Sequence, residues 1–301
     1  MTGTNIASLL ALGAALSWTL AGVFGHKPAV ALGSIQFNRI RMLVSMMMLA
    51  AWCGVTGTSF GINQGDAILI LLSGLIGAAA GDYFLFQTMR RMGPRRTGVL
   101  FAMNAPIAAL LGWLVLGEVV SLKTLLAIIL GFIGIVLAIV YGKRRDLAHV
   151  WEHITPPLWI GIVFGLLTAL GQAFGVMIMR PVMEGGLDPA VAGFYRTAVA
   201  VVVFHAVYPI ERLRGTAPKR YLPDPSLIKH IIGNSFFGMA FGMALLMKAL
   251  ETGSVATVSI LSSTSPLMML PIVWFQTKLI PPAGAWIGAL CVVLCSMLLV
   301  L

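Results

Sequence analysis

The sequence predicts an all-α membrane protein in which ten transmembrane helices form two inverted five-helix repeats. Three observations support this fold class. Hydrophobic residues make up 59% of the 301 residues and charged residues only 10%, whereas a soluble domain carries about 25% charged residues. The apolar residues gather in runs of helical length, and several residues recur about 160 positions further along the chain. A soluble domain and a disordered chain are both excluded, because neither tolerates so apolar a composition.

Ten apolar segments are long enough to cross a bilayer, whose hydrocarbon core takes about 20 residues of helix. None shows the strict alternation of a membrane β-barrel strand, and most connections end in Gly or Pro, which interrupt helices. The first five segments cover residues 6–24, 35–55, 67–89, 97–117 and 122–141. The second five cover residues 158–179, 189–210, 227–250, 254–276 and 283–301. The connections are too short to form domains, so we expect function to reside within the helices.

Lys and Arg are divided unequally between the two sides of the predicted bundle. The connections after odd-numbered helices hold thirteen of them: Lys27, Arg90, Arg91, Arg95, Arg96, Lys143, Arg144, Arg145, Arg212, Arg214, Lys219, Arg220 and Lys278. The connections after even-numbered helices hold three: Lys123, Arg180 and Lys248. Because Lys and Arg accumulate in cytoplasmic loops, we expect the odd connections in the cytoplasm and both termini outside. The same distribution accounts for the formal net charge of +10 without a nucleic-acid partner.

The two halves of the chain share an ordered set of residues. At a shift of 160 positions, Ala80, Leu85, Gly93, Thr97, Pro106 and Leu110 meet Ala240, Leu245, Gly253, Thr257, Pro266 and Leu270. Three further matches lie at shifts of 161 or 157: Gly77/Gly81 with Gly238/Gly242, Phe37 with Phe194, and Arg39 with Arg196. We therefore divide the chain into a first repeat (residues 1–141), a cytoplasmic linker (142–157) and a second repeat (158–301). Each repeat would hold five helices, and an odd number turns the second upside down, as in secondary transporters.

The first half combines a glycine-rich third helix with a spaced set of residues: Ser17-Trp18, Arg39, Gly93, Pro106, Leu116-Gly117-Glu118 and Gly134. This pattern resembles the ten-helix EamA-type members of the drug/metabolite transporter superfamily. The resemblance covers essentially the whole chain, once in each half. It implies export or exchange of small metabolites, often amino acids, by alternating access. It also implies a cavity lined by helices one, three, four, six, eight and nine.

Asp82 lies inside the third predicted helix, about 6 Å to the cytoplasmic side of its centre at 1.5 Å per residue. Arg39 and Arg41 in the neighbouring helix lie about 9 and 6 Å to the same side by the same arithmetic. A carboxylate at this depth costs several kcal/mol unless it is paired, protonated or hydrated. Two roles stay open for Asp82: a structural ion pair with these arginines, or a proton or cation site that couples transport.

Two prolines interrupt predicted helices at matching repeat positions, Pro106 and Pro266. Each removes one helical hydrogen bond and frees a carbonyl group about four residues earlier, which a membrane tolerates only where protein or a wet cavity satisfies that group. Polar side chains stand beside both breaks: Asn104, Ser262, Ser263 and Ser265. We expect these side chains to line a hydrophilic cavity. The alternative is that the hydroxyl groups bond back to their own helices and hold helices together.

Aromatic and amide side chains complete the candidate cavity. The aromatic rings offer a stacking surface or a gate, with packing between helices as the alternative. Trp18 and Phe174 occupy approximately equivalent positions in the two repeats. The full set of these candidates is Trp18, Tyr83, Trp113, Gln172, Phe174 and Asn234.

We therefore predict a secondary active transporter, an exporter or exchanger of a small polar or amphipathic metabolite such as an amino acid, with protons as the candidate coupling ion at Asp82. A lipid or lipid-headgroup flippase is the alternative, because the sequence does not exclude a lateral opening. An integral-membrane enzyme is less well supported, because no set of catalytic groups converges at one depth. No nucleotide-binding loop is present, so ATP-driven pumping by this chain alone is excluded.

The remaining expectations concern partners and location. We expect no cofactor and no metal site, because the cysteines are odd in number and all lie inside apolar runs: Cys53, Cys291 and Cys295. We expect a multi-pass protein of the bacterial inner membrane that contacts membrane lipids and a small-molecule substrate. It would be a monomer or a homodimer.

Overall fold

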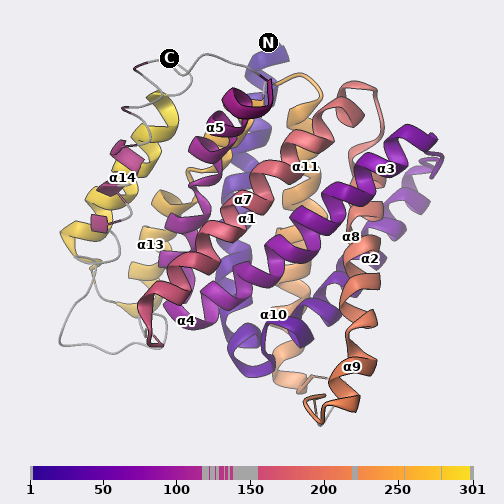
Figure 1. Cartoon of the computed structure of the whole chain (residues 1–301), viewed down its shortest axis with the longest axis horizontal. Coiled ribbons are helices and arrows are strands. Elements are labelled where there is room, and N and C mark those ends of the chain that lie inside the picture. The colour runs from indigo at the N-terminus through magenta and orange to yellow at the C-terminus, as the bar shows by residue number, and fades with distance from the viewer. Residues whose placement is uncertain are drawn as a thin grey trace.

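The computed structural model describes residues 3–116, 155–218, 223–253, 255–278 and 280–298, together with isolated positions between 122 and 137. Every regular element in these ranges is a helix (Figure 1). The helices of the first half are α1 (Gly3–Leu32), α2 (Ser34–Thr56), α3 (Gln64–Ser73), η1 (Gly74–Gly81), α4 (Asp82–Phe101) and α5 (Asn104–Leu116). Those of the second half are α7 (Leu158–Glu184), α8 (Pro189–Ala206), α9 (Tyr208–Leu213), α10 (Pro225–Asn234), η3 (Ser235–Ala240), α11 (Phe241–Leu250), α12 (Val255–Ser262), α13 (Ser265–Thr277) and α14 (Ala283–Leu298).

Within the described residues, six helices are long and apolar enough to cross a membrane: Ile6–Leu32, Ser34–Thr56, Gln64–Phe101, Leu158–Glu184, Pro189–Leu213 and Pro225–Leu250. Ser265–Gln276 is a shorter apolar helix. The protein is therefore an all-helical, multi-pass membrane protein. Most of the predicted span at residues 122–141, and the linker at 142–157 up to residue 154, lie outside the described residues.

Aspartate side chains cap the starts of two helices of the second half, α8 and α10. The Asp188 side chain accepts a hydrogen bond from the backbone N–H of Ala190 at 2.8 Å at the start of α8. The Asp224 side chain accepts one from Ser226 at 2.8 Å at the start of α10. In both cases a proline follows the cap and supplies a preset helical φ angle without needing its missing N–H. The sequence thus determines these helix starts locally.

Several predicted helix ends are wrong on the side of the bundle that was predicted to face the cytoplasm. α1 continues to Leu32, past the predicted end at residue 24, so Lys27 lies in a helix and not in a connection. The predicted third and fourth helices meet without a loop, because α4 turns at the single residue Gly93 (φ 77°, ψ 168°) and Pro94 starts the next helical turn at once. Arg95 and Arg96, expected in an exposed connection, are therefore buried in α4.

Two predicted spans are each divided in two. In span 97–117, α4 ends at Phe101 and α5 begins at Asn104; in span 254–276, α12 ends at Ser262 and α13 begins at Ser265. Pro106 and Pro266 lie in the first turn of α5 and α13, where a missing backbone N–H leaves no helical hydrogen bond unmade. Nδ2 of Asn104 donates to Oγ of Ser263 at 3.2 Å. This hydrogen bond joins the two helix breaks.

Each half also contains a π-helix at the same place. η1 begins at Gly74 and η3 at Ser235, a separation of 161 residues, which is one of the repeat shifts in the sequence. Each π-helix packs on the first two helices of the other half: η1 on α7 and α8, and η3 on α1 and α2. The two halves are therefore joined by reciprocal contacts.

Glycine makes the contact between η1 and α7 possible. A methyl group on Gly171 would lie 3.1 Å from Cα of Gly81, and one on Gly175 would lie 3.2 Å from Cα of Gly77. The Gly77/Gly81 pair thus faces the Gly171/Gly175 pair, as small residues do where membrane helices approach closely.

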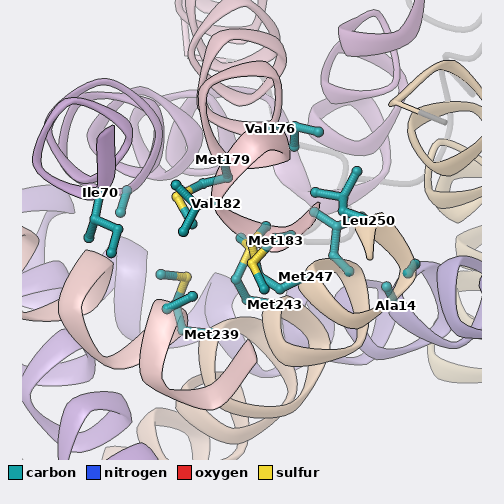
Figure 2. Close-up of a cluster of buried hydrophobic side chains, with 14 of the residues drawn as sticks. Ala14, Ile70, Val176, Met179, Val182, Met183, Met239, Met243, Met247 and Leu250 are labelled. Atoms are coloured by element: carbon teal, nitrogen blue, oxygen red, sulfur yellow. The ribbon is translucent and has the colours of Figure 1, made fainter. Parts of the chain in front are cut away.

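A buried apolar cluster fills the space between the halves beside the end of α7. Figure 2 shows the sulfur atoms of several methionines gathered at its centre. We call this group the methionine cluster: Met179 and Met183 of α7, Met239 of η3, and Met243 and Met247 of α11. Thioether side chains are flexible and fill irregular gaps, so this packing can rearrange more readily than one built from branched side chains.

Candidate functional site

A cavity of about 90 Å³ lies between the two halves, bordered on one side by Met239 and Met243 of the methionine cluster. Its lining comes from α1, α2, α4, α7, α10, η3, α11 and α13, and therefore from both halves of the chain. Six candidates from the sequence line it: Trp18, Arg41, Asp82, Gln172, Asn234 and Ser265.

An ion pair between Asp82 and Arg41 stands at the cavity wall. Nη2 of Arg41 donates to Oδ2 of Asp82. The Arg41 side chain is 3% exposed and the Asp82 side chain 18% exposed, so the carboxylate is the more accessible member. Asp82 occupies this position because it begins α4 directly after η1, and Asn38 Nδ2 donates to its backbone carbonyl at 3.2 Å.

The guanidinium of Arg41 is satisfied by further neighbours. Nε donates to Oδ1 of Asn38 at 2.8 Å, and Nη1 donates to Oδ1 of Asn234 at 3.4 Å. Cζ lies 4.6 Å from the centre of the Phe86 ring, within the range of a cation–π contact. Arg41 is thus held from both halves of the chain, since Asn234 belongs to α10.

Arg39 does not pair with Asp82. Its Nη2 donates to Oε2 of Glu211 at 2.6 Å, its Nε donates to the carbonyl of Phe204 at 3.1 Å, and its Nη1 donates to Gln36. Two residues along a helix turn by about 200°, so Arg39 and Arg41 point to different neighbours. Arg39 therefore fastens α2 to the end of α8 and to α9, away from the cavity.

Trp18 and Asn234 each bridge α1 to the second half. The Trp18 Nε1 donates to the carbonyl of Gly238 at 3.0 Å, and Nδ2 of Asn234 donates to the carbonyl of Ala21 at 2.7 Å. The Trp18 ring meets the Phe101 ring edge-on at 5.5 Å. Within the described residues the Gln172 side chain has no hydrogen-bond partner, although it lines the cavity and is only 7% exposed. Gln172 therefore offers the cavity an amide that makes no hydrogen bond to the described residues.

The other candidates lie outside this cavity lining. The Tyr83 hydroxyl accepts a hydrogen bond from Gln87, and the ring packs on Phe84. Ser262 and Ser263 both donate to the carbonyl of Ser259. These hydroxyl groups thus bond back to their own segment, which was the alternative to lining a cavity. The remaining members outside the lining are Arg39, Asn104, Phe174, Pro106 and Pro266. The side chain of Trp113 lies outside the described residues.

Sequence reasoning missed two contributors to the site, Asn38 and Phe86, and the partner of Arg39. Asn38 stands three residues before Arg41, a spacing that brings side chains together on a helix, and this signal was available. Phe86 likewise follows Asp82 by four residues on α4. Glu211 gave no such signal, because it lies 172 residues from Arg39.

The sequence matches the family described as the EamA-like transporter family twice, over residues 5–140 and 159–301. No protein of curated function matches the chain in sequence. The chain is similar to the crystal structure of a protein that is 15% identical, with a TM-score of 0.70 over 97% of this chain and 95% of the other. Such a likeness shows a shared fold alone.

Proposed function

Because the chain belongs to the EamA-like transporter family of the drug/metabolite transporter superfamily, we propose that it is a secondary transporter whose substrate binds in the cavity between the halves. The transported molecule is a small polar or amphipathic metabolite such as an amino acid, and the direction is export or exchange. The ten helices form two inverted five-helix repeats, residues 1–141 and 158–301, which rock against each other to open the cavity to each side in turn.

The observation that carries this proposal is the mixed chemistry of the cavity. Asp82 supplies a partly exposed carboxylate, and Gln172 supplies an amide that makes no hydrogen bond to a described residue. Apolar surface comes from Phe86, Phe101 and Met269. A ligand with a polar head and a small apolar part satisfies both kinds of surface, as is usual for small-molecule sites.

Protons are the proposed coupling ion. Protonation of Asp82 removes the charge that Arg41 pairs with, and so weakens the contact between α2 and α4. A cycle that protonates Asp82 on one side of the membrane and deprotonates it on the other would link proton flow to the movement of the repeats. We propose a location in the bacterial inner membrane, as a monomer or a homodimer.

Binding tests the proposal directly. Purified protein is heated with amino acids, nucleosides, vitamins or lipid headgroups, and the ligand that raises the unfolding temperature is then used in counterflow with liposomes. Gln172→Leu should abolish that stabilisation while leaving the unfolding temperature of the ligand-free protein almost unchanged, because Gln172 bonds to no described residue. A headgroup as the only stabilising ligand would favour a flippase. A ligand that stabilises Gln172→Leu equally would contradict binding in this cavity.

A further inference from the structure

Arg196 of α8 is a buried cation with no carboxylate partner within the described residues. Its side chain is fully buried, and Nε and Nη2 make no hydrogen bond. Nη1 contacts only thioether sulfurs, Sδ of Met243 at 3.2 Å and Sδ of Met247 at 3.8 Å. A thioether sulfur is a weak hydrogen-bond acceptor. The positive charge of Arg196 is therefore poorly compensated at its position against the methionine cluster.

The repeat shows that the second half has no counterpart of Asp82. In the first half, Arg41 of α2 pairs with Asp82 at the start of α4, while Arg39, the repeat counterpart of Arg196, pairs with Glu211. At the repeat shift of 161, the position of Asp82 is taken by Met243, which is the residue that Arg196 contacts. The second half therefore retains a buried arginine but has a thioether where the first half has its acid.

Arg196 lies against the π-helix that leads into Asp82. Nη2 of Arg196 lies 2.9 Å from where a Cβ atom on Gly77 would stand, and Asp82 follows Gly77 by five residues, about one turn of the π-helix. Glycine at 77 and at 175 leaves the guanidinium room beside η1.

We propose that Arg196 is a second ion-pair partner of Asp82, so that Asp82 exchanges Arg41 for Arg196 when the methionine cluster opens. In the arrangement described here the cluster is closed and Asp82 pairs with Arg41. Opening the cluster hydrates Arg196 and allows η1 to carry Asp82 toward it, while Arg41 keeps Asn38 and Asn234. The unpaired charge of Arg196 thus destabilises the closed cluster and favours its opening. This inference rests on the proposed alternating access.

Reporter cysteines measure how accessible the methionine cluster and the cavity are to water, and the measurement needs no substrate. In full-length protein that lacks Cys53, Cys291 and Cys295, one cysteine replaces Met183 in the methionine cluster and, in a second protein, one replaces Met89 in the cavity wall. An impermeant maleimide is applied to liposomes from each side. Arg196→Met should slow labelling at position 183 and accelerate it at position 89, each by about tenfold, because it removes the charge that favours opening.

Arg41→Met should shift both labelling rates in the opposite direction, because Asp82 then has only Arg196. Arg39→Lys, which retains a cation beside Glu211, should leave both rates as in the wild type. A merely structural role of Arg196 would not produce opposite changes at the two positions. Wild-type protein that labels at one position alone would contradict alternating access itself. Wild-type labelling at both positions with no change in Arg196→Met would overturn only the exchange of partners.

The unfolding temperature of further variants tests the proposal independently of labelling and shows whether each variant folds. Met243→Asp gives Arg196 the missing acid, and it should unfold at or above the wild-type temperature and label as Arg196→Met does. Met239→Asp, its matched control in the same cluster, buries an acid at a position whose native side chain is not among the methionines that Arg196 contacts, and it should unfold at a lower temperature. Combining Met243→Asp with Arg196→Met should lower the unfolding temperature below that of Met243→Asp alone, because the new acid then has no cation beside it. If Met243→Asp is as unstable as Met239→Asp, Arg196 does not need a carboxylate and the proposal is wrong.

Discussion

Asp82 contacts the guanidinium of Arg41 through its side chain and Asn38 through its backbone. One substitution at this residue therefore tests binding and coupling together. Asp82→Asn removes the charge but keeps an oxygen that can accept from Arg41. We expect the protein to fold, with an unfolding free energy lower by no more than about 3 kcal/mol, and driven transport in liposomes to be lost.

The matched control is Asp66→Asn, which changes a partly exposed acid in the first turn of α3. It should leave transport and the unfolding temperature close to the wild type. Unchanged transport and pH dependence in Asp82→Asn would refute a coupling role for this carboxylate. Loss of transport in both variants would show that the assay responds to something other than the buried pair.

The sequence located this pair only partly. It identified Asp82 and two arginines at similar depth, but depth along a helix does not say which side chain faces the neighbouring helix. The different directions of Arg39 and Arg41 depend on how α2 is rotated against α4 and α8, and that rotation is determined by packing. Glu211 lies in a segment that the sequence assigned to a connection, so its pairing with Arg39 was not predictable.

At the scale of elements, the π-helices are the main feature that the sequence did not predict. Their residues are as apolar as those of an α-helix, and a local widening of the turn leaves no mark in hydropathy. The repeated Gly77/Gly81 and Gly238/Gly242 pairs marked the right segments, but they predicted close packing and not a π-helix. Side chains of α1 complete the wider turns, since Ser17 and Trp18 donate to the carbonyls of Phe237 and Gly238.

The contact between η1 and α7 can be tested at Gly171. A methyl group there would lie 3.0 Å from the carbonyl oxygen of Ile76 and 3.1 Å from Cα of Gly81, and backbone atoms cannot move aside cheaply. We expect Gly171→Ala to lower the unfolding free energy by about 1–3 kcal/mol through overpacking. Thermal unfolding in detergent measures the effect.

Gly54→Ala is the matched control, because a methyl group on Gly54 would meet nothing within 4 Å. Alanine is the better helix former by about 1 kcal/mol, so this variant should unfold at the wild-type temperature or above it. Equal unfolding temperatures for the two variants would show that η1 and α7 separate easily.

The two helix breaks depend on Asn104. Its Nδ2 donates to the carbonyl of Phe101 at 2.8 Å and to Oγ of Ser263 at 3.2 Å. Asn104→Ala leaves the Phe101 carbonyl without this partner, so we expect a loss of about 1–3 kcal/mol in unfolding free energy. The unfolding temperature again provides the measurement.

Ser262→Ala serves as the comparison at the second break. Among the described residues the Ser262 hydroxyl bonds only the carbonyl of Ser259, which also accepts from Ser263, so its removal should cost about 1 kcal/mol or less. A larger loss in Ser262→Ala than in Asn104→Ala would mean that the breaks are stabilised separately and not by the bond between them.

At the scale of the whole molecule, composition was enough to predict an all-helical membrane protein, because hydrophobic burial in lipid leaves few alternatives. The repeat was also visible in the sequence, and the family match occurs once in each half. Which side chains surround the cavity was less predictable: Trp18, Gln172 and Asn234 come from three helices whose rotations are set only when both halves pack together. The same limit explains why Arg95 and Arg96 were expected in a loop.

The orientation of the protein in the membrane is a separate prediction, since it depends on charge rather than packing. Lys27 in α1 and the buried Arg95 and Arg96 no longer count as connection charges, yet removing them leaves ten cations in the odd connections against three in the even ones. The bias therefore still predicts that the odd connections lie in the cytoplasm. A reporter attached before residue 1 or after Leu301 should therefore be active outside the cell, and an even number of spans requires both positions to agree. Figure 1 is consistent with such a path, because α14 ends at the end of the molecule where α1 begins. A cytoplasmic reporter at both positions would reverse the orientation, whereas reporters on opposite sides would rule out ten spans.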